Sequence, residues 1–427
     1  MRRCGCSMSW PAGGATTSKR SRCPAMPADA GETLQVALGT IGRFHFFDLA
    51  RELNRRSHLA AIFTGYPLCR LRDTGVPSSR IRRFPWIQVP VVGLSRAGLL
   101  PSALYPALDA LAHRTLDAHI ARNLPPCHVL SAMSSTGLAA GRAAQTRGIA
   151  YVCDRGSTHA LWRDRLLAEE YMRLGLPLRR THPALLAREQ REYEAADAIT
   201  VPSGFARASF VAMGVPAEKL RVIPYGVDLS AFRRTAPRDD GFRVLFVGQL
   251  SARKGLGYLL DGFRKARIPR ATLVLVGDAQ PETETLLERF PVDRLERVGP
   301  VPRDEVVRQM SRASVLVLPS LEEGLALVQA QAMACGCPVI ASTNTGSEDL
   351  FADGVEGFVV PVRDAGAIAD RLTRLRDDPA LLARMSGAAL NRVKTIGGWA
   401  AYGDASLRLF HELARARGHD IAPLSAD

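Results

Sequence analysis

The chain of 427 residues carries a formal net charge of +14, with 47% hydrophobic and 23% charged residues, a composition typical of a soluble globular protein. This length exceeds what one hydrophobic core usually serves, so we expect two domains. The longest uncharged stretch, residues 324–347, contains Pro338, Gln329, Gln331 and Asn344, which excludes a transmembrane helix. The eight cysteines lack the spacing of a zinc site or a disulfide framework, so we expect no metal and a reducing cytoplasm.

The excess positive charge lies in the N-terminal half. Residues 31–235 hold 27 Lys or Arg against 16 Asp or Glu, whereas residues 236–427 hold 24 against 25. No helix-turn-helix, RRM or zinc-finger pattern is present, so an anionic membrane surface or a phosphorylated acceptor is a better partner than nucleic acid. Solvated arginines without a partner are the alternative explanation. Residues 1–30 lack periodicity and are predicted to be a disordered tail, with an artefact of an early start codon as the alternative.

Short apolar runs alternate with longer amphipathic stretches, a pattern typical of βα units that feed parallel sheets. Ten runs are predicted as strands: residues 34–39, 59–65, 128–133, 149–154 and 198–203 in the first half, and 243–249, 272–278, 314–320, 338–342 and 357–362 in the second. These two sets predict an α/β protein with two Rossmann-like, doubly wound domains. Such domains bind ligands beyond the carboxyl ends of their strands, so we expect the chemistry in a central cleft between them.

The domain boundaries follow from a loss of periodicity in residues 222–241, which gather Pro, Gly and charged residues. We expect an N-terminal, acceptor-binding domain over residues 31–225, a linker over residues 226–240 and a C-terminal, donor-binding domain over residues 241–398. Residues 399–427 have the apolar spacing of a helix, which we expect to pack back across the linker onto the N-terminal domain.

A glycine-bearing turn follows the first predicted strand and opens a helix (GTIGRFHFFDLAREL, residues 39–53). This position places Gly42 and Arg43 at the edge of the cleft, although such a turn is common to all Rossmann-like units. His45 is predicted to pack or to be solvated rather than to act in catalysis. The segment CDRGSTHALW ends another predicted strand and brings two further residues to the cleft: Asp154 and Arg155.

The segment VGQLSARKG, residues 247–255, leads from a strand through a turn at Gly248 to a predicted helix. Arg253 and Lys254 therefore lie beside a helix N-terminus at the end of a strand, where a phosphate is favoured. Lys254 is positioned to stabilise a departing diphosphate. An exposed basic turn is the alternative explanation.

A second strand, loop and helix cover residues 315–336, with Glu323 just before the helix and Gln331 eight residues later. Two turns of 3.6 residues bring Gln331 to nearly the same helix face as Glu323. A capping carboxylate is the alternative explanation for Glu323. The backbone amides that open this helix are expected to cradle a diphosphate, and they belong to Gly324, Leu325, Ala326 and Leu327.

These two segments, in this order and separation, resemble the donor domain of the family 4 glycosyltransferases, which have the GT-B fold. Residues 198–232 and 337–372 extend the resemblance, which covers about residues 31–415 and is more specific in the second half. The family signature pairs two glutamates separated by seven residues. Glu323 matches the first, whereas Gln331 replaces the second.

The resemblance implies roles for particular residues. It places four residues of the N-terminal domain on the acceptor side: Gly42, Arg43, Asp154 and Arg155. It places Glu323 at the donor sugar and reacting phosphate, Gln331 on the nucleotide ribose, and His159 near the reacting carbon of the donor. Packing alone is the alternative for His159. The backbone of Val298 and Gly299 is expected to line the base.

The chain also departs from the family pattern at Gln249, where an arginine usually contacts the phosphates. Arg253, beside Lys254, is expected to compensate for it. A glutamine at position 331 can still accept a hydrogen bond from a ribose hydroxyl, so we expect weaker nucleotide binding rather than none.

The resemblance implies a retaining, metal-independent transferase that moves a sugar from a nucleoside diphosphate sugar, as co-substrate without further cofactor, to a glycan, lipid-linked or small-molecule acceptor. We expect it to act in polysaccharide or glycolipid synthesis, in the cytoplasm or on the inner face of the membrane. A non-catalytic nucleotide-sugar-binding relative is the alternative. A nicotinamide-dependent dehydrogenase is disfavoured, because neither domain has the G-x-G-x-x-G turn followed by an acidic residue.

Overall fold

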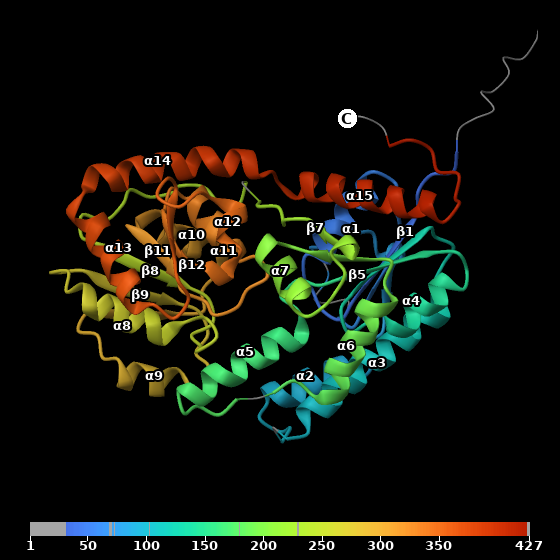
Figure 1. The fold of residues 1–427 in the computed structure, drawn as a ribbon, viewed down its shortest axis with the longest axis horizontal. Helices are drawn as coiled ribbons and strands as arrows, with labels where there is room; N and C mark the ends of the chain where they lie inside the picture. The colour runs from blue at the N-terminus through green and yellow to red at the C-terminus, as the bar shows by residue number, and fades with distance from the viewer. Residues whose placement is uncertain are drawn as a thin grey trace, which may run out of the picture.

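The computed structural model describes residues 31–424, apart from residues 68–70, 72, 102, 179 and 229. The predicted disordered tail, residues 1–30, lies outside the described residues. Two α/β units lie side by side, each built on one parallel sheet (Figure 1). This architecture confirms the predicted fold class.

The N-terminal sheet has seven parallel strands in the order β3-β2-β1-β4-β5-β6-β7. Its central strands are buried on both faces, as parallel strands covered by helices must be. The strand order reverses between β1 and β4, so the loops that follow these two strands open a crevice. The strands are β1 Val36–Thr40, β2 Leu59–Thr64, β3 Ile81–Arg83, β4 Val129–Met133, β5 Ala150–Asp154, β6 Ala198–Val201 and β7 Leu220–Val222.

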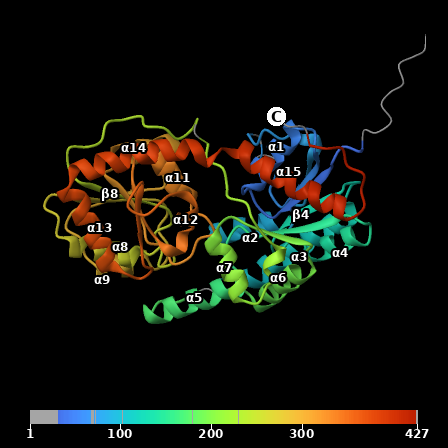
Figure 2. The ribbon, with the colours of Figure 1, turned by 45° about the horizontal axis from the view of Figure 1, so that its top comes forward.

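Seven α-helices of the N-terminal domain follow these strands. Most of them cover the two faces of the sheet, whereas α5 reaches toward the C-terminal domain (Figures 1 and 2). They are α1 Phe46–Arg55, α2 Gln88–Arg96, α3 Tyr105–Asn123, α4 Leu138–Gln145, α5 Ala160–Arg173, α6 Pro183–Ala195 and α7 Gly204–Ala212.

The C-terminal sheet has six parallel strands in the order β10-β9-β8-β11-β12-β13, which reverses between β8 and β11. Its strands are β8 Arg243–Val247, β9 Thr272–Val276, β10 Leu295–Gly299, β11 Val315–Leu318, β12 Val339–Ser342 and β13 Gly357–Val360. Its helices are α8 Leu256–Ala266, α9 Thr283–Arg289, α10 Arg303–Arg312, α11 Leu327–Ala334, α12 Ser347–Leu350, α13 Ala365–Asp377 and α14 Pro379–Ile396. The crevice of this domain therefore lies beside the loops after β8 and β11.

All ten strands expected from the sequence are present, but β3, β7 and β10 were not expected. Each of the three lies at the edge of its sheet. Edge strands are covered less than central strands, and these carry charged residues in place of a continuous apolar run, as in LERVG of β10. The sequence therefore lacks the apolar signal by which the central strands are recognised.

The last helix, α15 Trp399–Ala416, leaves the C-terminal domain and packs against α1 of the N-terminal domain (Figure 2). The guanidinium of Arg56 donates a hydrogen bond of 2.6 Å to Asp404 on this helix. A side chain at Gly226 would begin 2.3 Å from the backbone of Gly398, so the linker and the return segment pass in close contact. The two domains are thus joined by two crossings of the chain.

The domains also touch beside the cleft. A Cβ atom at Gly324 would lie 2.2 Å from the carbonyl oxygen of Gly156, so only glycine permits this approach. The hydroxyl of Ser203 donates to the Gly324 carbonyl at 2.5 Å. Further out, Glu170 of α5 accepts hydrogen bonds from Tyr258 and Arg363 of the C-terminal domain at 2.6 and 2.7 Å. The two domains are therefore in direct contact at these points.

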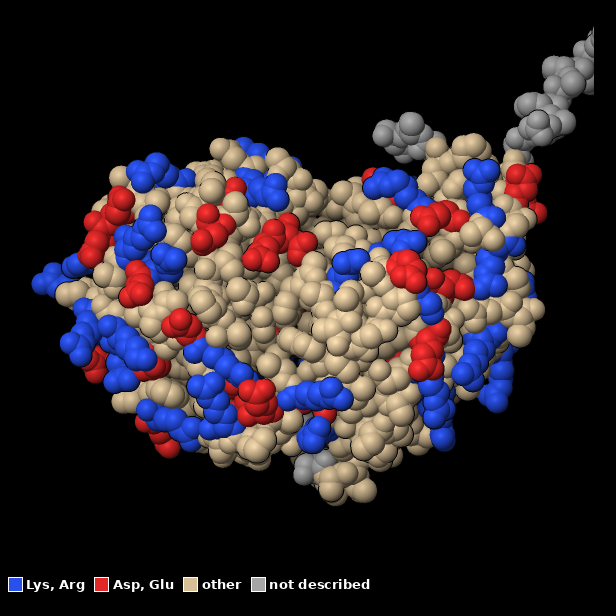
Figure 3. All heavy atoms as spheres, viewed as in Figure 1, with Lys and Arg blue, Asp and Glu red and all other residues tan. Residues whose placement is uncertain are grey.

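Basic and acidic side chains are interspersed over both domains on the face shown in Figure 3, rather than gathered into one basic patch. Within the part of the chain that the structure describes, no helix has the length and apolar character needed to cross a bilayer.

Candidate active site

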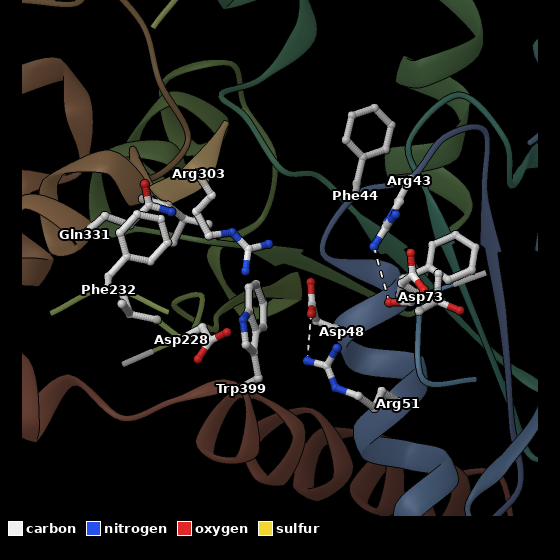
Figure 4. Close-up of a pocket in the computed structure, with 15 residues that line it drawn as sticks. Arg43, Phe44, Asp48, Arg51, Asp73, Asp228, Phe232, Arg303, Gln331 and Trp399 are labelled. Carbon is white, nitrogen blue, oxygen red and sulfur yellow. Dashed lines mark hydrogen bonds and ion pairs between the residues drawn. The ribbon is translucent and has the colours of Figure 1, made fainter. Parts of the chain in front are cut away.

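Two adjacent cavities occupy the cleft. The first, here called the inter-domain cavity, has a volume of about 640 Å³ and is lined by both domains (Figure 4). The second, here called the N-terminal cavity, has a volume of about 660 Å³ and is lined mainly by the N-terminal domain. They adjoin, because four residues line both: Phe44, Asp48, Leu327 and Trp399.

The turn between β8 and α8 brings the predicted phosphate ligands to the strand-order reversal of the C-terminal sheet. Gly255 has φ of +74°, and a Cβ there would lie 2.0 Å from the carbonyl oxygen of Pro319, so the turn packs tightly on the loop after β11. Lys254 Nζ consequently forms an ion pair with Glu323. Gly248, with φ of +150°, lies in the same turn.

Arg253 joins this pair. Its Nη1 donates to the Glu322 carbonyl at 2.9 Å and lies 3.7 Å from Glu323 Oε2. Burial opposes the charged guanidinium, but Glu323 and Glu322 outweigh it and raise the pKa of Arg253. Two cations and two carboxylates therefore form a charge cluster, and an incoming diphosphate would compete with the carboxylates for the cations.

The segment that opens α11 presents backbone donors beside the charge cluster. The amide of Glu323 donates to Asn344 and that of Ala326 to Thr345, at 3.0 and 3.2 Å. By contrast, the amides of Gly324 and Leu325 have no hydrogen-bond acceptor among the described residues. These free donors and the positive end of the helix dipole suit an anion.

Gln331 lies on α11 and lines the inter-domain cavity, as does Arg303 at the start of α10 (Figure 4). The side-chain amide of Gln331 makes no hydrogen bond to the described residues. The nearby Gly299 has φ of +74°, and its carbonyl accepts from Gly277 at 2.9 Å, while Val298 is half-buried. Gln331 is thus available to a ligand, whereas Glu323 is engaged by Lys254.

On the N-terminal side, the loop after β1 contributes to both cavities. Arg43 lines the inter-domain cavity, and its guanidinium reaches the carbonyl oxygen of Asp73 at 3.5 Å (Figure 4). Gly42 is buried, and its carbonyl accepts from the Thr40 hydroxyl at 3.0 Å. Of these two expected acceptor-side residues, Arg43 therefore offers a side chain to the cleft.

His45, expected to pack or to be solvated, is half-buried and packed in the wall of the N-terminal cavity. Its Nε2 is 2.8 Å from Oδ1 of Asp154, and its ring lies on that of Tyr225 with centroids 4.5 Å apart. Asp154 also accepts from the Thr200 hydroxyl at 2.8 Å. The other ring nitrogen, Nδ1, has no partner among the described residues. A histidine so oriented by a carboxylate is suited to hold or move a proton.

Arg155 lines the same cavity, but its guanidinium is engaged in hydrogen bonds within the N-terminal domain. It donates to Glu189 at 2.5 Å and to the Thr158 carbonyl at 3.0 Å. Burial opposes its charge, yet Glu189 raises the pKa of Arg155. Arg155 therefore shapes the cavity wall as half of a buried ion pair.

The structure places His159 beneath the cleft rather than in it. It precedes α5, is 1% exposed, and packs against Tyr193 and Phe210 with ring centroids 5.1 and 5.0 Å away. It lines neither cavity. Burial, reinforced by Arg155, lowers the pKa of His159 to about 4, so the ring is neutral at pH 7. Its Nδ1 is buried without a hydrogen-bond partner.

Two families of known proteins match this chain. Residues 43–231 match the model described as Glycosyltransferase Family 4, and residues 241–378 match the model described as Glycosyl transferases group 1. Together the two matches cover most of the chain. The chain belongs to the family 4 glycosyltransferases.

Among curated relatives, the amylovoran biosynthesis glycosyltransferase AmsK of Erwinia amylovora is 31% identical over 199 residues, which are 43% of this chain and 49% of AmsK. The chain spans about half the length of the curated relatives it matches. Sucrose-phosphate synthase of Thermosynechococcus elongatus has a similar structure, with a TM-score of 0.67 at 23% identity over 90% of this chain and 100% of that one. The Anabaena HepE complex with UDP-glucose gives 0.66 at 17% identity over 89% and 100%. These structures share the GT-B fold.

Sequence reasoning missed one buried member of this site, Glu322. It is 1% exposed and accepts hydrogen bonds from Ser157 and Thr158 of the other domain, with hydroxyl distances of 2.5 and 2.8 Å. Burial opposes its charge, but Arg253 and Arg163 prevail and lower the pKa of Glu322. The doubled glutamate in SLEEG was the available signal, and nothing in the sequence said which carboxylate turns inward.

Proposed function

We propose that this chain transfers a sugar from a nucleoside diphosphate sugar, bound by the C-terminal domain, to a hydroxyl group held by the N-terminal domain. The observation that carries the proposal is the charge cluster of Arg253, Lys254 and Glu323 beside the free amides of Gly324 and Leu325. These groups lie at the strand-order reversal, which is where doubly wound sheets bind phosphate-bearing ligands.

In this proposal the cleft stabilises the leaving diphosphate. The bond between the anomeric carbon and the phosphate oxygen breaks as the acceptor oxygen bonds to that carbon, and negative charge develops on the diphosphate. Lys254, Arg253 and the α11 amides are positioned to stabilise that charge, which is the largest contribution a preorganised site makes. Metal independence is proposed on the same basis, because these residues already supply the positive charge.

Retention of the anomeric configuration is proposed from the family resemblance. The hydroxyl proton must leave the acceptor in either stereochemical course, and His45 is the titratable group of the N-terminal cavity with a free ring nitrogen and an orienting carboxylate. We propose that His45 positions the acceptor hydroxyl group. Proton NMR of the glycoside product gives the anomeric configuration directly.

The donor is proposed to contact Gln331 through its ribose, because that amide faces the inter-domain cavity without a partner. The Anabaena HepE structure holds UDP-glucose, which makes UDP-glucose the first donor to test. AmsK is named for amylovoran biosynthesis, which supports a glycan or lipid-linked acceptor in polysaccharide synthesis.

A peripheral location on the inner face of the membrane is also proposed. The segment around α2 exposes apolar side chains, including Trp86, which is 72% exposed, Val89 and Leu94. Arg82 and Arg83 precede them in β3 and are exposed. Aromatic and aliphatic side chains beside arginines suit the interface of an anionic bilayer.

The test is turnover of UDP-, GDP- and ADP-sugars by the purified chain, measured as release of nucleoside diphosphate with and without candidate acceptors. Acceptor-dependent release that is lost in Lys254→Ala is expected. The non-catalytic alternative, motivated by Gln249 and Gln331, requires saturable binding of a nucleotide sugar with no release in any acceptor mixture.

A further inference from the structure

A third cavity lies on the outer side of the N-terminal domain, between α3 and α6, and has a volume of about 580 Å³. We call it the α3–α6 groove. Its floor consists of Ala and Leu side chains from both helices, among them Leu108, Leu111 and Ala187. The two helices run beside one another at the base of the domain (Figures 1 and 2). This volume is in the range of ligand-binding clefts.

The rim of the groove carries three arginines, Arg114, Arg188 and Arg191. Arg188 is held inward by ion pairs to Asp117 and Glu192. Arg114 and Arg191 are exposed and form no ion pair with any described residue. The rim therefore holds two uncompensated positive charges next to an apolar floor.

The mutual proximity of these arginines has an electrostatic consequence. The pKa of Arg188 is lowered, mainly by burial. Glu192 opposes this effect, whereas the positive charges of Arg114 and Arg191 add to it. Like charges held close together are relieved when an anion binds between them, which favours a phosphate over a neutral ligand.

The groove adjoins the catalytic cleft. Leu185 contributes to the wall of the groove and to the wall of the N-terminal cavity, so one side chain separates the two spaces. Leu99 and Leu104, on the chain leading to α3, are further exposed apolar side chains. The N-terminal cavity, the arginine rim and the apolar floor thus offer surfaces suited to a sugar, a phosphate and a hydrocarbon segment.

We propose that the α3–α6 groove binds the phosphate and the first apolar segment of an acceptor in which the sugar is linked to a lipid through phosphate. The inference rests on the proposed function, because the sugar end must then reach the N-terminal cavity. The arginine rim recognises the phosphate, and the Ala and Leu floor covers the adjoining hydrocarbon. A bilayer phospholipid bound at α2 is a separate contact and does not require this groove.

Binding is tested first without catalysis, by calorimetry with farnesyl diphosphate, inorganic diphosphate and farnesol below its aggregation concentration. Farnesyl diphosphate is expected to bind the wild type, and the double variant Arg114→Ser/Arg191→Ser to bind it at least about tenfold more weakly, the scale of a lost charged hydrogen bond. Ala187→Trp, which fills the exposed side of the groove, should weaken it similarly. Arg408→Ser, an exposed arginine on α15 with no ion pair to described residues, is the matched control and should bind as wild type does.

Three results would overturn the proposal: inorganic diphosphate binding as tightly as farnesyl diphosphate, binding unchanged in both groove variants, or no binding of farnesyl diphosphate. The first would leave only an anion site. Kinetics then separates this proposal from the proposed function. The groove variants should raise KM for a lipid-phosphate-linked acceptor about tenfold and leave a short, water-soluble acceptor unaffected. Equal losses with both acceptors would contradict the groove, whereas a wild type inactive with every donor and acceptor would contradict the transferase.

Discussion

His45 Nε2 lies 2.8 Å from Asp154 Oδ1 at the wall of the N-terminal cavity, although 109 residues separate the two in the chain. The pair exists because β1 and β5 are brought to the same end of one sheet, with β4 between them. The carboxylate fixes the ring, and Tyr225 packs against it. The orientation of the ring, and with it of the free Nδ1, is therefore fixed in the cavity that we propose for the acceptor.

His45→Gln is expected to lower kcat/KM for the acceptor about 10- to 100-fold, in the range of general acid–base and positioning effects. The donor Kd should stay within about twofold, because the phosphate-binding groups are in the other domain. Initial-rate kinetics and equilibrium binding of the nucleotide measure the two quantities. His411→Gln serves as control, because His411 lines neither cavity and its one hydrogen bond to the described residues is to the Ala422 carbonyl. A donor-binding loss equal to the kinetic loss would contradict the acceptor-side assignment.

Lys254→Ala is expected to raise donor KM and lower kcat, because it removes a charge from both the bound and the departing diphosphate. Arg253→Ala should do the same if Arg253 replaces the arginine that the family usually has at position 249. Lys265→Ala, on the exposed face of α8 and paired only with Asp261, is the control for loss of a lysine. Wild-type kinetics in Arg253→Ala would show that its role is confined to holding Glu322.

Glu323→Gln changes the shape of the side chain little but removes the carboxylate that pairs with Lys254. We expect a loss of kcat of at least about 100-fold, the scale of removing one electrostatic group from a preorganised site. Differential scanning fluorimetry should show an intact fold. Full activity would require abandoning the placement of Glu323 at the reacting phosphate.

Gln331→Glu restores the family's usual residue beside Arg303, and nucleoside diphosphate binding should be unchanged or tighter, within about tenfold, as one improved hydrogen bond allows. Gln331→Ala should weaken binding, because the cavity then offers no acceptor at that point. Isothermal titration with UDP, GDP and ADP measures both. Loss of all binding in Gln331→Glu would show that the site is built around a neutral group.

His159 supplies a pH test of its location. Its folded pKa of about 4 lies below the ordinary value of 6.5, so the unfolded chain binds this proton more readily. The contribution to stability is complete above pH 6.5 and is lost as the pH falls toward 4. His159→Leu should therefore lose less unfolding free energy than wild type between pH 7 and pH 5, measured by urea denaturation. Normal kcat in a folded His159→Leu would exclude the predicted contact with the donor sugar.

The sequence alone was enough to predict the two parallel sheets. Their central strands are buried on both faces and therefore consist of apolar runs, such as LVLV in β9. The sequence also placed Lys254 in the turn after a strand and Glu323 just before a helix, because each lies in a short strand–loop–helix motif. The edge strands β3, β7 and β10 were missed because exposure permits charged residues there. Only the tertiary structure decided which carboxylate of Glu322 and Glu323 faces inward, and that His45 meets Asp154 while His159 is buried. The first two outcomes depend on contacts between segments more than 100 residues apart along the chain, set by domain closure and sheet order. The burial of His159 depends on packing against Tyr193 and Phe210 of later elements, and no local pattern encodes any of the three.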